Sequence, residues 1–578
     1  MTNDDMEKRL NDIASCVSVI SKLSSEPRAS RPAGLPESAS GAVGARGSLA
    51  QLLRSPQEGK DAKGKESMKL LPLSRLSTLP LMVMVLMLSS LPSLPGSSLA
   101  GDAVITYSAP QGEKESEDYK VDAGGKPVFV YTAPVLRGGP ASFAYFDFSG
   151  SITVSVATTR KIGTVKILPT SYAIKPTVSE NRVSFTLSKP LNLTIELNES
   201  IERPLHLFAN PLEADRPDPT SKDVIYFGPG VHEVTTLRPK SGQTVYLAGG
   251  AILRAKIPPD EKPVQEKNWR GNKVWAALIE TGGAKDVKVR GRGILDMGPL
   301  PWHARTAMWF GGSTDILVEG IVILDAPAWV VAMHNSKNVV VRNVKQICAR
   351  ENSDGIDICN SQDVLVEDCF LRNNDDEVCV KTISSPPAME SKNIVVRRCV
   401  VWNDRARGLG ITSETRANIS NVLFKDCDII HDFSSGGECS ALAVLVSDSG
   451  TMSDIRFENI RVEDSRNTLV NCWIGADMWG HDKTRGHIKG VTFKDILVTG
   501  KTVPVMKLNG CDDKHLIDDV RIENVRIQGS PIRSAETAKL QTNAYVRGLA
   551  IVAGPDEIQK SANKVPEDTA RKLADPQH

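Results

Sequence analysis

A short motif of hydrophobic and polar positions recurs nine times between residues 286 and 524. Each copy has an acidic, amide or small residue, an apolar residue, a variable residue, a second apolar residue and two further positions that are mostly polar. The first apolar position, here called the motif anchor, falls at 287, 316, 339, 364, 394, 422, 455, 491 and 520. Copies 23–36 residues apart, without a long helical pattern between them, are typical of a β-solenoid. We therefore predict an all-β fold in which residues 223–532 form a right-handed, single-stranded parallel β-helix, and we exclude a βαβ barrel and a leucine-rich horseshoe.

Three cysteines follow the same period. Cys369, Cys399 and Cys427 each lie five residues after an anchor, where other copies carry Ile or Val. This pattern predicts an inward-facing aliphatic column in which Cys acts as a small buried hydrophobe. A disulfide framework is the alternative, but nine cysteines after residue 100 are an odd number, and no paired CxxC motif favours a metal cluster.

The segment 101–222 has a different pattern. Short stretches of alternating apolar and polar residues, such as "SITVSVAT" and "RVSFTLS", are separated by turn residues. This alternation is typical of an antiparallel β-sandwich. A packing domain and a carbohydrate-binding domain are both compatible with it.

The first hundred residues have the pattern of a leader. Residues 68–100 contain Met68, the basic Arg75, the apolar run "LPLMVMVLMLSSL" and a small-residue end "SSLA", as in a secretory signal. A membrane-spanning helix is the alternative, but the apolar run is well short of the roughly 20 residues required. We predict a secreted or periplasmic protein with no membrane span after removal of the signal. Residues 1–67 are then an upstream extension, disordered or a misassigned start, and residues 533–578 are a polar C-terminal tail.

Composition narrows the functional classes further. The 70 Lys and Arg residues balance 69 Asp and Glu residues, for a net charge of +1. Nucleic-acid partners call for a basic excess, so we predict none. The oligomeric state is left open by the sequence.

Acidic residues are concentrated in two successive copies, in the segments "NSDG" and "NNDDEVCVK". Asp354 and Asp376 are 22 residues apart, and each lies two residues before an apolar position, Ile356 or Val378. If these apolar positions stack, the two carboxylates enter neighbouring coils at equivalent places, with Asp375 one residue away. The Asn, Ser, Asp and Gly residues around them predict that all three lie on turns.

Three carboxylates at one place repel one another, which raises at least one pKa and leaves a protonated acid beside ionised partners. Glycoside hydrolysis requires this combination, because one carboxylic acid protonates the leaving oxygen while a carboxylate activates water. The alternative is that these Asp and Asn side chains only satisfy turn backbone in a β-solenoid.

At these motifs the chain resembles the polygalacturonases of glycoside hydrolase family 28, whose NTDG and DD signatures correspond to "NSDG" and "NDDEVCVK". The resemblance covers roughly 225–530. The β-sandwich before a β-helix, with "DCFLRNNDD" and "VWND", is equally similar to the family 49 dextranases of the same clan. This resemblance implies an inverting polysaccharide hydrolase that needs no cofactor and no metal. It implies Asp375 as the general acid, with Asp354 and Asp376 holding the attacking water.

Two departures from the polygalacturonase pattern bear on the substrate. Leu409 in "RGLG" stands where those enzymes have the histidine of Gly-His-Gly. Their Arg-Ile-Lys, which grips a uronate, corresponds to "VNCWIGADMWG" at 470–480, which has no paired basic residues. Because a uronate needs a cationic clamp, this change favours a neutral or differently charged glycan, while Arg405 and Arg407 keep anionic substrates open.

Five residues are candidates for substrate binding: Asn352, Lys381, Arg407, Glu414 and Trp473. Lys381 would be a hydrogen-bond donor, Glu414 would lie near the place of the missing histidine, and Trp473 would stack on a sugar. The alternatives are a strand-surface charge for Lys381, a solvated turn charge for Arg407 and a loop carboxylate for Glu414. A second tryptophan, Trp329, is predicted in the core.

Two rival functions follow from the same residues. A Ca²⁺-dependent polysaccharide lyase would use Asp354, Asp375 and Asp376 as hard oxygen ligands. A non-catalytic glycan-binding solenoid would use the coils only as a surface.

Overall fold

The computed structural model describes residues 103–384 and 387–555, which contain strands and one short 3-10 helix, η1 (Thr170–Tyr172). The predicted signal at 68–100 and the upstream segment 1–67 lie outside the described residues and stay predictions. Within the described part, no helix has the length and apolar character needed to cross a membrane.

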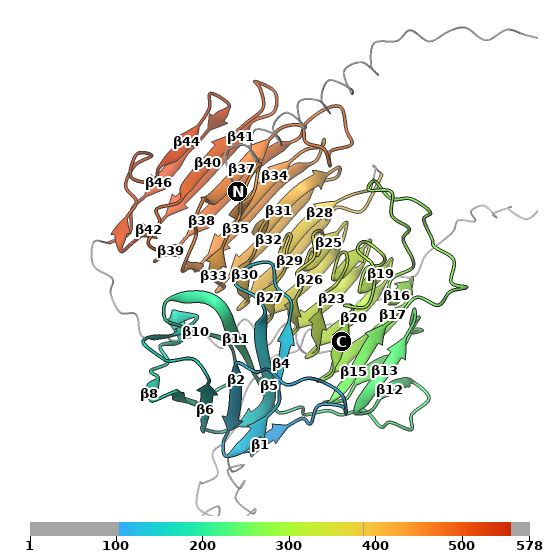
Figure 1. Cartoon of the computed structure of the whole chain (residues 1–578). Helices are drawn as coiled ribbons and strands as arrows, with labels where there is room; N and C mark the ends of the chain where they lie inside the picture. Colours follow the sequence, from blue (N-terminus) through green and yellow to red (C-terminus); the bar gives the residue numbers. More distant parts are fainter. Residues whose placement is uncertain (1–102, 385–386, 556–578) are drawn as a thin grey trace, which may run out of the picture. The chain divides into compact units, whose positions relative to one another are not determined.

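The N-terminal domain is a sandwich of two mainly antiparallel sheets (Figure 1). One sheet has the order β1 (Ala103–Thr106), β5 (Ala141–Ser149), β11 (Ser200–Pro211), β10 (Leu191–Leu197), β7 (Val165–Leu168), with β4 (Val130–Ala133) paired to β5. The other has the order β3 (Lys126–Val128), β2 (Tyr119–Ala123), β6 (Ile152–Thr158), β9 (Arg182–Leu187), β8 (Thr177–Ser179). Alternate residues of both sheets, such as Val121, Phe146, Val154 and Leu207, form one buried core between them.

Three long sheets with parallel strands build the C-terminal domain, and each coil before residue 517 contributes at most one strand to each sheet. Sheet 1 contains β12 (Val224–Phe227), β14 (Thr244–Leu247), β17 (Lys285–Gly291), β20 (Thr314–Glu319), β23 (Lys337–Arg342), β26 (Gln362–Glu367), β29 (Ser391–Arg397), β32 (Ile419–Lys425), β35 (Thr451–Glu458), β38 (His487–Lys494), β41 (Ile517–Glu523), β45 (Val546–Arg547) and β46 (Ala550–Val552).

Sheet 2 contains β13 (Gly230–Val234), β15 (Ala251–Ala255), β18 (Ile294–Asp296), β21 (Val322–Leu324), β24 (Lys345–Ile347), β27 (Phe370–Arg372), β30 (Val400–Asn403), β33 (Asp428–Asp432), β36 (Arg461–Val462), β39 (Leu497–Val498), β42 (Arg526–Ile527) and β43 (Ser530–Pro531), the last pair antiparallel. Sheet 3 contains β16 (Ile279–Gly282), β19 (Met308–Gly311), β22 (Val331–His334), β25 (Ile356–Cys359), β28 (Val378–Thr382), β31 (Arg407–Thr415), β34 (Ser440–Val446), β37 (Thr468–Ile474), β40 (Val505–Asn509) and β44 (Leu540–Thr542). The predicted fold class, a β-sandwich followed by a parallel β-helix, is confirmed. Strands β44, β45 and β46 extend the sheets past residue 532, the predicted end of the β-helix.

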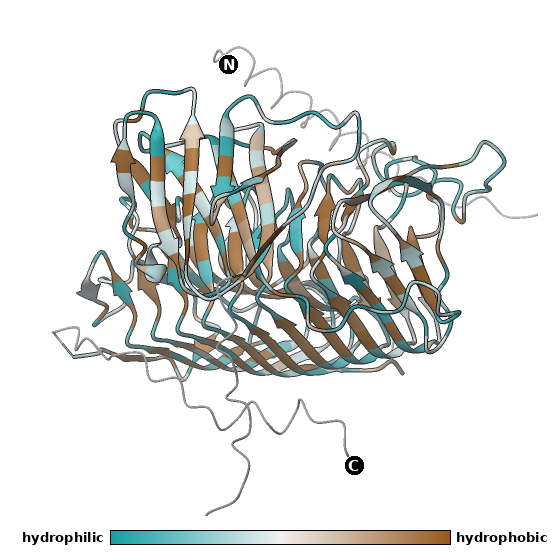
Figure 2. Cartoon of the chain, turned by 90° about the horizontal axis from the view of Figure 1, so that it is seen from below, coloured by the Kyte–Doolittle hydropathy of each residue, from teal (hydrophilic) through white to brown (hydrophobic). Residues whose placement is uncertain are grey.

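The nine motif anchors form one column on sheet 1. Val287 pairs with Ile316, Ile316 with Val339, and Val339 with Val364. The column continues in the same way through the anchors at 394, 422, 455, 491 and 520. All nine anchors are buried, so the sequence motif gives the register of the coils directly. Figure 2 shows the same arrangement as brown, hydrophobic stretches along the strands, with teal, hydrophilic residues prominent in the loops.

The first residue of the motif has a conformational role. Eight of the nine copies place Asp or Asn there with φ between +51° and +58°, and the ninth places Gly490 with φ +72°. This left-handed region is open to Gly and is visited by Asn and Asp far more often than by other residues. The restriction of this position to acidic, amide or small residues is therefore a backbone requirement within the sheet 1 strands, just before each motif anchor.

The cysteine column is also confirmed. Cys369, Cys399 and Cys427 are fully buried, as are the Ile and Val residues at the equivalent places of other coils. The nine cysteines of the described residues are free thiols. Burial rather than cross-linking explains their spacing.

An aromatic cluster joins the sandwich to sheet 2. Phe208 of β11 lies 5.1 Å from Phe370 of β27, measured between ring centroids. Tyr131 and Phe143 of the sandwich and Trp402 of β30 belong to the same buried cluster. The two domains therefore share a hydrophobic core at this face.

Replacement of Asn421 tests the backbone requirement. Asn421 has φ +52°, so Asn421→Gly should be more stable than Asn421→Ala by about 1 kcal/mol, because only Ala brings a Cβ into the left-handed region. Urea unfolding of both variants measures the difference, and both lose the same side-chain hydrogen bonds. Equal stability of the two variants would contradict the proposed role of this position.

Candidate active site

The acidic residues lie where the strands of sheet 3 begin. Ile356 pairs with Val378, and Val378 pairs with Leu409 in the next coil. Asp354 and Asp376 each lie two residues before this column, so the predicted stacking of the two carboxylates in neighbouring coils is confirmed. The same position in the third coil belongs to Arg407, while Leu409 is fully buried in the column itself.

Buried polar side chains stabilise the two turns that carry the acids. The buried carboxylate of Glu377 accepts hydrogen bonds from Asn373 N at 2.9 Å and from Asn373 Nδ2 at 2.7 Å. Asn374 N donates to Ser353 Oγ at 3.1 Å, which links the two turns. Gly355 allows this close packing, because a Cβ there would lie 2.4 Å from the backbone oxygen of Glu377. These contacts fix the backbone that carries the acids.

The three aspartates have different surroundings. Asp354 and Asp376 are 3% and 2% exposed, whereas Asp375 is partly exposed. Asp354 Oδ2 lies 2.9 Å from Lys381 Nζ, and Asp376 Oδ1 lies 3.3 Å from Arg407 Nη1. Among the described residues, Asp375 has no cation within ion-pair distance; it accepts hydrogen bonds from Asn352 N at 3.2 Å and from Asp376 N at 3.0 Å.

Lys381 is the central cation of the site. Its Nζ lies 2.9 Å from both Asp354 Oδ2 and Asp357 Oδ1, and 3.9 Å from Glu414 Oε2. It also lies 4.3 Å from the centre of the Trp329 ring. Although burial opposes its charge, Asp354 and Asp357 raise the pKa of Lys381 well above its usual value. Lys381 therefore stays charged. Asp357, which was not among the residues predicted from the sequence, belongs to the same ionic cluster.

Burial and mutual repulsion raise the pKa values of several acids of the site. Burial, followed by the charges of Asp354 and Asp376, raises the pKa of Asp375 well above the usual value of a carboxyl. Burial also raises the pKa of Asp354, although Lys381 acts against it. Burial raises the pKa of Glu414 as well. The site thus combines a carboxyl that holds its proton with two carboxylates next to fixed cations, a pairing suited to acid and base catalysis.

A metal site is the weaker interpretation of this cluster. One ligand atom each from Asp354, Asp376 and Cys379 lie within 4.8 Å of one another. Burial raises the pKa of the Cys379 thiol well above its usual value, so that the sulfur stays protonated and donates to Asp357 Oδ1 at 3.1 Å. Lys381 and Arg407 already compensate the two carboxylates, and a divalent cation would be repelled by both.

A cleft of about 480 Å³ opens above these residues. The predicted site residues that line it are Asn352, Asp354, Asp375, Asp376, Lys381, Arg407 and Glu414. Trp473 is not among the lining residues; it lies on β37 with its ring packed against Gly475. Trp329, predicted in the core, lines the cleft instead.

Two long loops contribute to the cleft aromatic residues that were not predicted as site residues from the sequence. Trp269 comes from the loop between β15 and β16, and Trp479 comes from the loop between β37 and β38. Their ring centroids are 5.0 Å apart with the rings at 88°, so the loops meet at the cleft. Arg270 and Arg405 lie 3.4 Å and 3.9 Å from the same carboxylate, that of Glu351. The first of these loops precedes the first motif copy and the second lies between two copies. Neither loop is periodic, so the sequence motif does not predict that they meet at the site.

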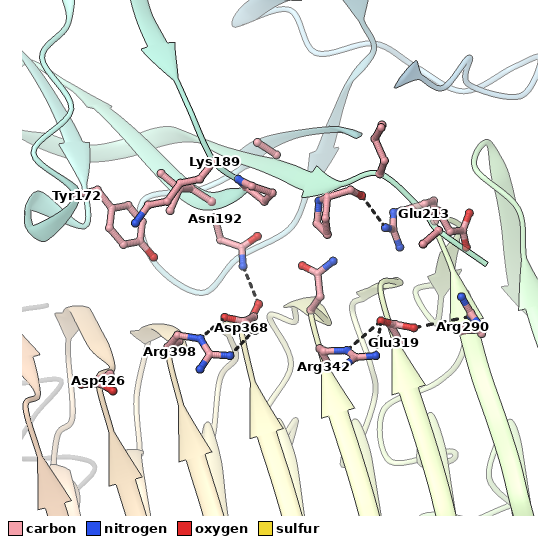
Figure 3. Close-up of a pocket in the computed structure, with 18 of the residues that line it drawn as sticks. Tyr172, Lys189, Asn192, Glu213, Arg290, Glu319, Arg342, Asp368, Arg398 and Asp426 are labelled. Atoms are coloured by element: carbon pink, nitrogen blue, oxygen red, sulfur yellow. Dashed lines mark hydrogen bonds and ion pairs between the residues drawn. The ribbon is translucent and has the colours of Figure 1, made fainter. Parts of the chain in front are cut away.

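A second, larger cleft of about 830 Å³ lies between the sandwich and the β-helix (Figure 3). Several of its charged side chains are paired with one another, as Arg342 is with Glu319 at 2.8 Å and Arg398 with Asp368 at 2.8 Å. It shares no lining residue with the acidic cleft. We therefore assign the chemistry to the smaller cleft.

Comparison with known proteins supports this assignment. Residues 300–545, which include the three aspartates of the acidic cleft, match the model of Glycosyl hydrolases family 28. The predicted resemblance to the polygalacturonases of this family is confirmed by the match. A polygalacturonase of Cryptomeria japonica is 23% identical over 310 residues, covering 50% of this chain and 57% of that protein. A polygalacturonase of Chamaecyparis obtusa is 22% identical over 307 residues, covering 49% of this chain and 57% of that protein.

Among solved structures, Dex49A from Penicillium minioluteum has the same fold, with a TM-score of 0.54 and 16% identity over 77% of this chain and 96% of that chain. At this identity the similarity concerns the fold alone. The chain spans little more than half the length of the curated relatives it matches.

Replacement of Lys381 tests the ionic cluster. Lys381→Met leaves Asp354 and Asp357 buried without their cation, and should lower the free energy of unfolding by about 3 kcal/mol. Both carboxyls should then bind protons more tightly in the folded than in the unfolded chain, so the loss should grow as the pH rises above the ordinary carboxyl pKa. Denaturant unfolding at several pH values measures this.

The exposed Lys337 on β23 provides the control, because Lys337→Met removes the same charge from the surface. Equal stability of Lys381→Met and Lys337→Met would show that the cluster does not depend on Lys381.

Proposed function

We propose that this protein is an exported, polygalacturonase-like glycoside hydrolase that cleaves a polysaccharide with inversion and uses Asp354, Asp375 and Asp376. The observation that carries the proposal is the in-register placement of two cation-paired carboxylates beside a third carboxyl with a strongly raised pKa. The match of residues 300–545 to glycosyl hydrolases supports it. Export rests on the signal pattern at 68–100 alone.

In this mechanism Asp375 is the general acid. Its raised pKa keeps the proton available for the glycosidic oxygen as the bond breaks. Asp354 and Asp376 orient a water molecule and remove its proton as it attacks the anomeric carbon from the opposite face. Lys381 and Arg407 pair with these two carboxyls and compensate their negative charge.

The residues around the acids favour a sugar chain as the substrate. Trp269, Trp329 and Trp479 offer aromatic faces to the cleft, as carbohydrate sites commonly do. Arg270 and Arg405 add two partly exposed guanidinium groups that could pair with an anionic sugar in place of Glu351. Polygalacturonate and a neutral glucan such as dextran are therefore the first two substrates to compare, with sulfated glycans third.

The aspartate roles are tested by single substitutions. Asp375→Asn, Asp354→Asn and Asp376→Asn should each lower kcat by about a hundredfold or more on the accepted polysaccharide, because each removes an acid–base or water-positioning group. Reducing-sugar release measures kcat. Asp454→Asn, at a 59%-exposed carboxylate on sheet 1, is the matched control and should keep full activity.

Full activity of Asp375→Asn would contradict the assignment. Loss of activity in EDTA together with an unsaturated product that absorbs in the ultraviolet would replace the hydrolase by the rival lyase.

The pH profile tests the electrostatics. Arg407 lowers the pKa of Asp375, so Arg407→Gln should raise this pKa further and move the alkaline limb of kcat/KM to higher pH. The sign follows because the general acid is lost on deprotonation. Arg405→Gln removes an equal charge from the cleft mouth and should leave the limb in place. A limb that moves to lower pH in Arg407→Gln would mean that Asp375 is not the group that limits activity at alkaline pH.

A further inference from the structure

We propose that the β-sandwich positions the catalytic turns, and that His206 and Arg137 act as positioning residues through Arg372 and Asp404. This inference rests on the proposed hydrolase function. It assigns to the sandwich a role inside the reaction, in place of a separate glycan-binding or packing role.

Arg372 is the point of contact. It is the last residue of β27, three residues before Asp375, and its side chain is fully buried. Its Nη1 donates to His206 Nε2 of β11 at 3.0 Å, and its Nη2 donates to the backbone oxygen of Arg137 at 2.5 Å. The sandwich thus supplies two of the acceptors of this guanidinium.

Asp404 receives the other side of the guanidinium. Arg372 Nε donates to Asp404 Oδ2 at 3.2 Å, and both side chains are 0% exposed. Trp402 donates from Nε1 to Asp404 Oδ1 at 3.0 Å, and its ring lies 3.7 Å from the guanidinium carbon of Arg372. Arg137 Nε donates to the backbone oxygen of Asp404 at 2.9 Å. The sandwich therefore holds both partners of this buried ion pair.

The ion pair joins the two turns that carry the site. Asp375 and Asp376 follow Arg372 in one coil, and Arg407 follows Asp404 in the next. Asp376 and Arg407 are themselves paired at 3.3 Å, so a shift of either turn changes the charge next to the attacking water. An error of about 1 Å in such a position is enough to cost a hundredfold in rate.

The chemistry of His206 fits this role. A guanidinium has only donors, so His206 Nε2 must accept and the ring must be neutral. Burial, followed by the charge of Arg372, lowers the pKa of His206 well below its usual value. Its Nδ1–H then donates to Thr194 Oγ1 at 2.8 Å, which fixes the ring. Without His206, Arg372 would be left with a buried donor that has no acceptor, which costs free energy.

A second contact in the same interface provides a control. Asn192 Nδ2 of β10 donates to the backbone oxygen of Asp368 at 2.9 Å. This bond also joins the sandwich to the β-helix, but neither residue lines the acidic cleft. A purely structural role of the sandwich predicts similar effects from His206 and Asn192, whereas a positioning role separates them.

The test compares His206→Ala, Arg137→Met and the control Asn192→Ala on the accepted polysaccharide. We expect kcat to fall about 10- to 100-fold in the first two variants with KM changed less than about twofold, and both constants to be nearly unchanged in Asn192→Ala. His206→Gln, whose amide oxygen can accept from Arg372, should recover much of kcat. Arg137→Met keeps the acceptor oxygen for Arg372, so it remains measurable if His206→Ala does not fold.

Amide hydrogen exchange gives a readout that needs no substrate. His206→Ala should speed exchange in 372–377 and 403–407, and Asn192→Ala should not. Unchanged kcat and exchange in His206→Ala, or an equal loss of kcat in Asn192→Ala, would overturn the positioning role. If the unmodified protein cleaves no glycan, the hydrolase proposal fails, while the exchange data still decide whether the sandwich orders these turns.

Discussion

Parallel pairing of each coil on the previous one, with the apolar positions at the starts of the strands kept in register, is the constraint on which the rest of the structure depends. The column Ile356–Val378–Leu409 exists because β25, β28 and β31 pair in register at their first apolar positions. A slip of one residue would turn every side chain of a strand to the other face. The same register that fills the core with apolar residues therefore brings Asp354 and Asp376 to equivalent positions of adjacent coils.

Burial then determines the charge state and the ion pairing of these neighbouring carboxyls. Buried carboxylates are costly unless paired, and Asp354 and Asp376 each have a cation from the next coil on, Lys381 and Arg407. Asp375, one residue along the same turn, has no such partner among the described residues, and burial together with the charges of Asp354 and Asp376 raises its pKa well above the usual value of a carboxyl. One repetitive scaffold thus places neighbouring carboxyls in different electrostatic surroundings, two of them with a cation at ion-pair distance.

The periodic part of this arrangement could be predicted from the sequence, because periodicity and register are the same information in a solenoid. The motif anchors, the cysteine column and the stacking of Asp354 on Asp376 all followed from spacing. The loops could not be predicted. Trp479 lines the cleft and Trp473 does not, because β37 ends at Ile474, and the residue pattern of that segment contains no sign of where the strand stops.

Contacts between the two domains could not be predicted either, since His206 and Arg372 are 166 residues apart and neither belongs to the motif.

We propose that the protein hydrolyses a polysaccharide with Asp375 as acid and with water held by Asp354 and Asp376 on the opposite face. Proton NMR of the anomeric signal during the first turnovers on the accepted polysaccharide tests it most directly. We expect a first product of inverted configuration, and a first product of retained configuration would contradict the proposed mechanism.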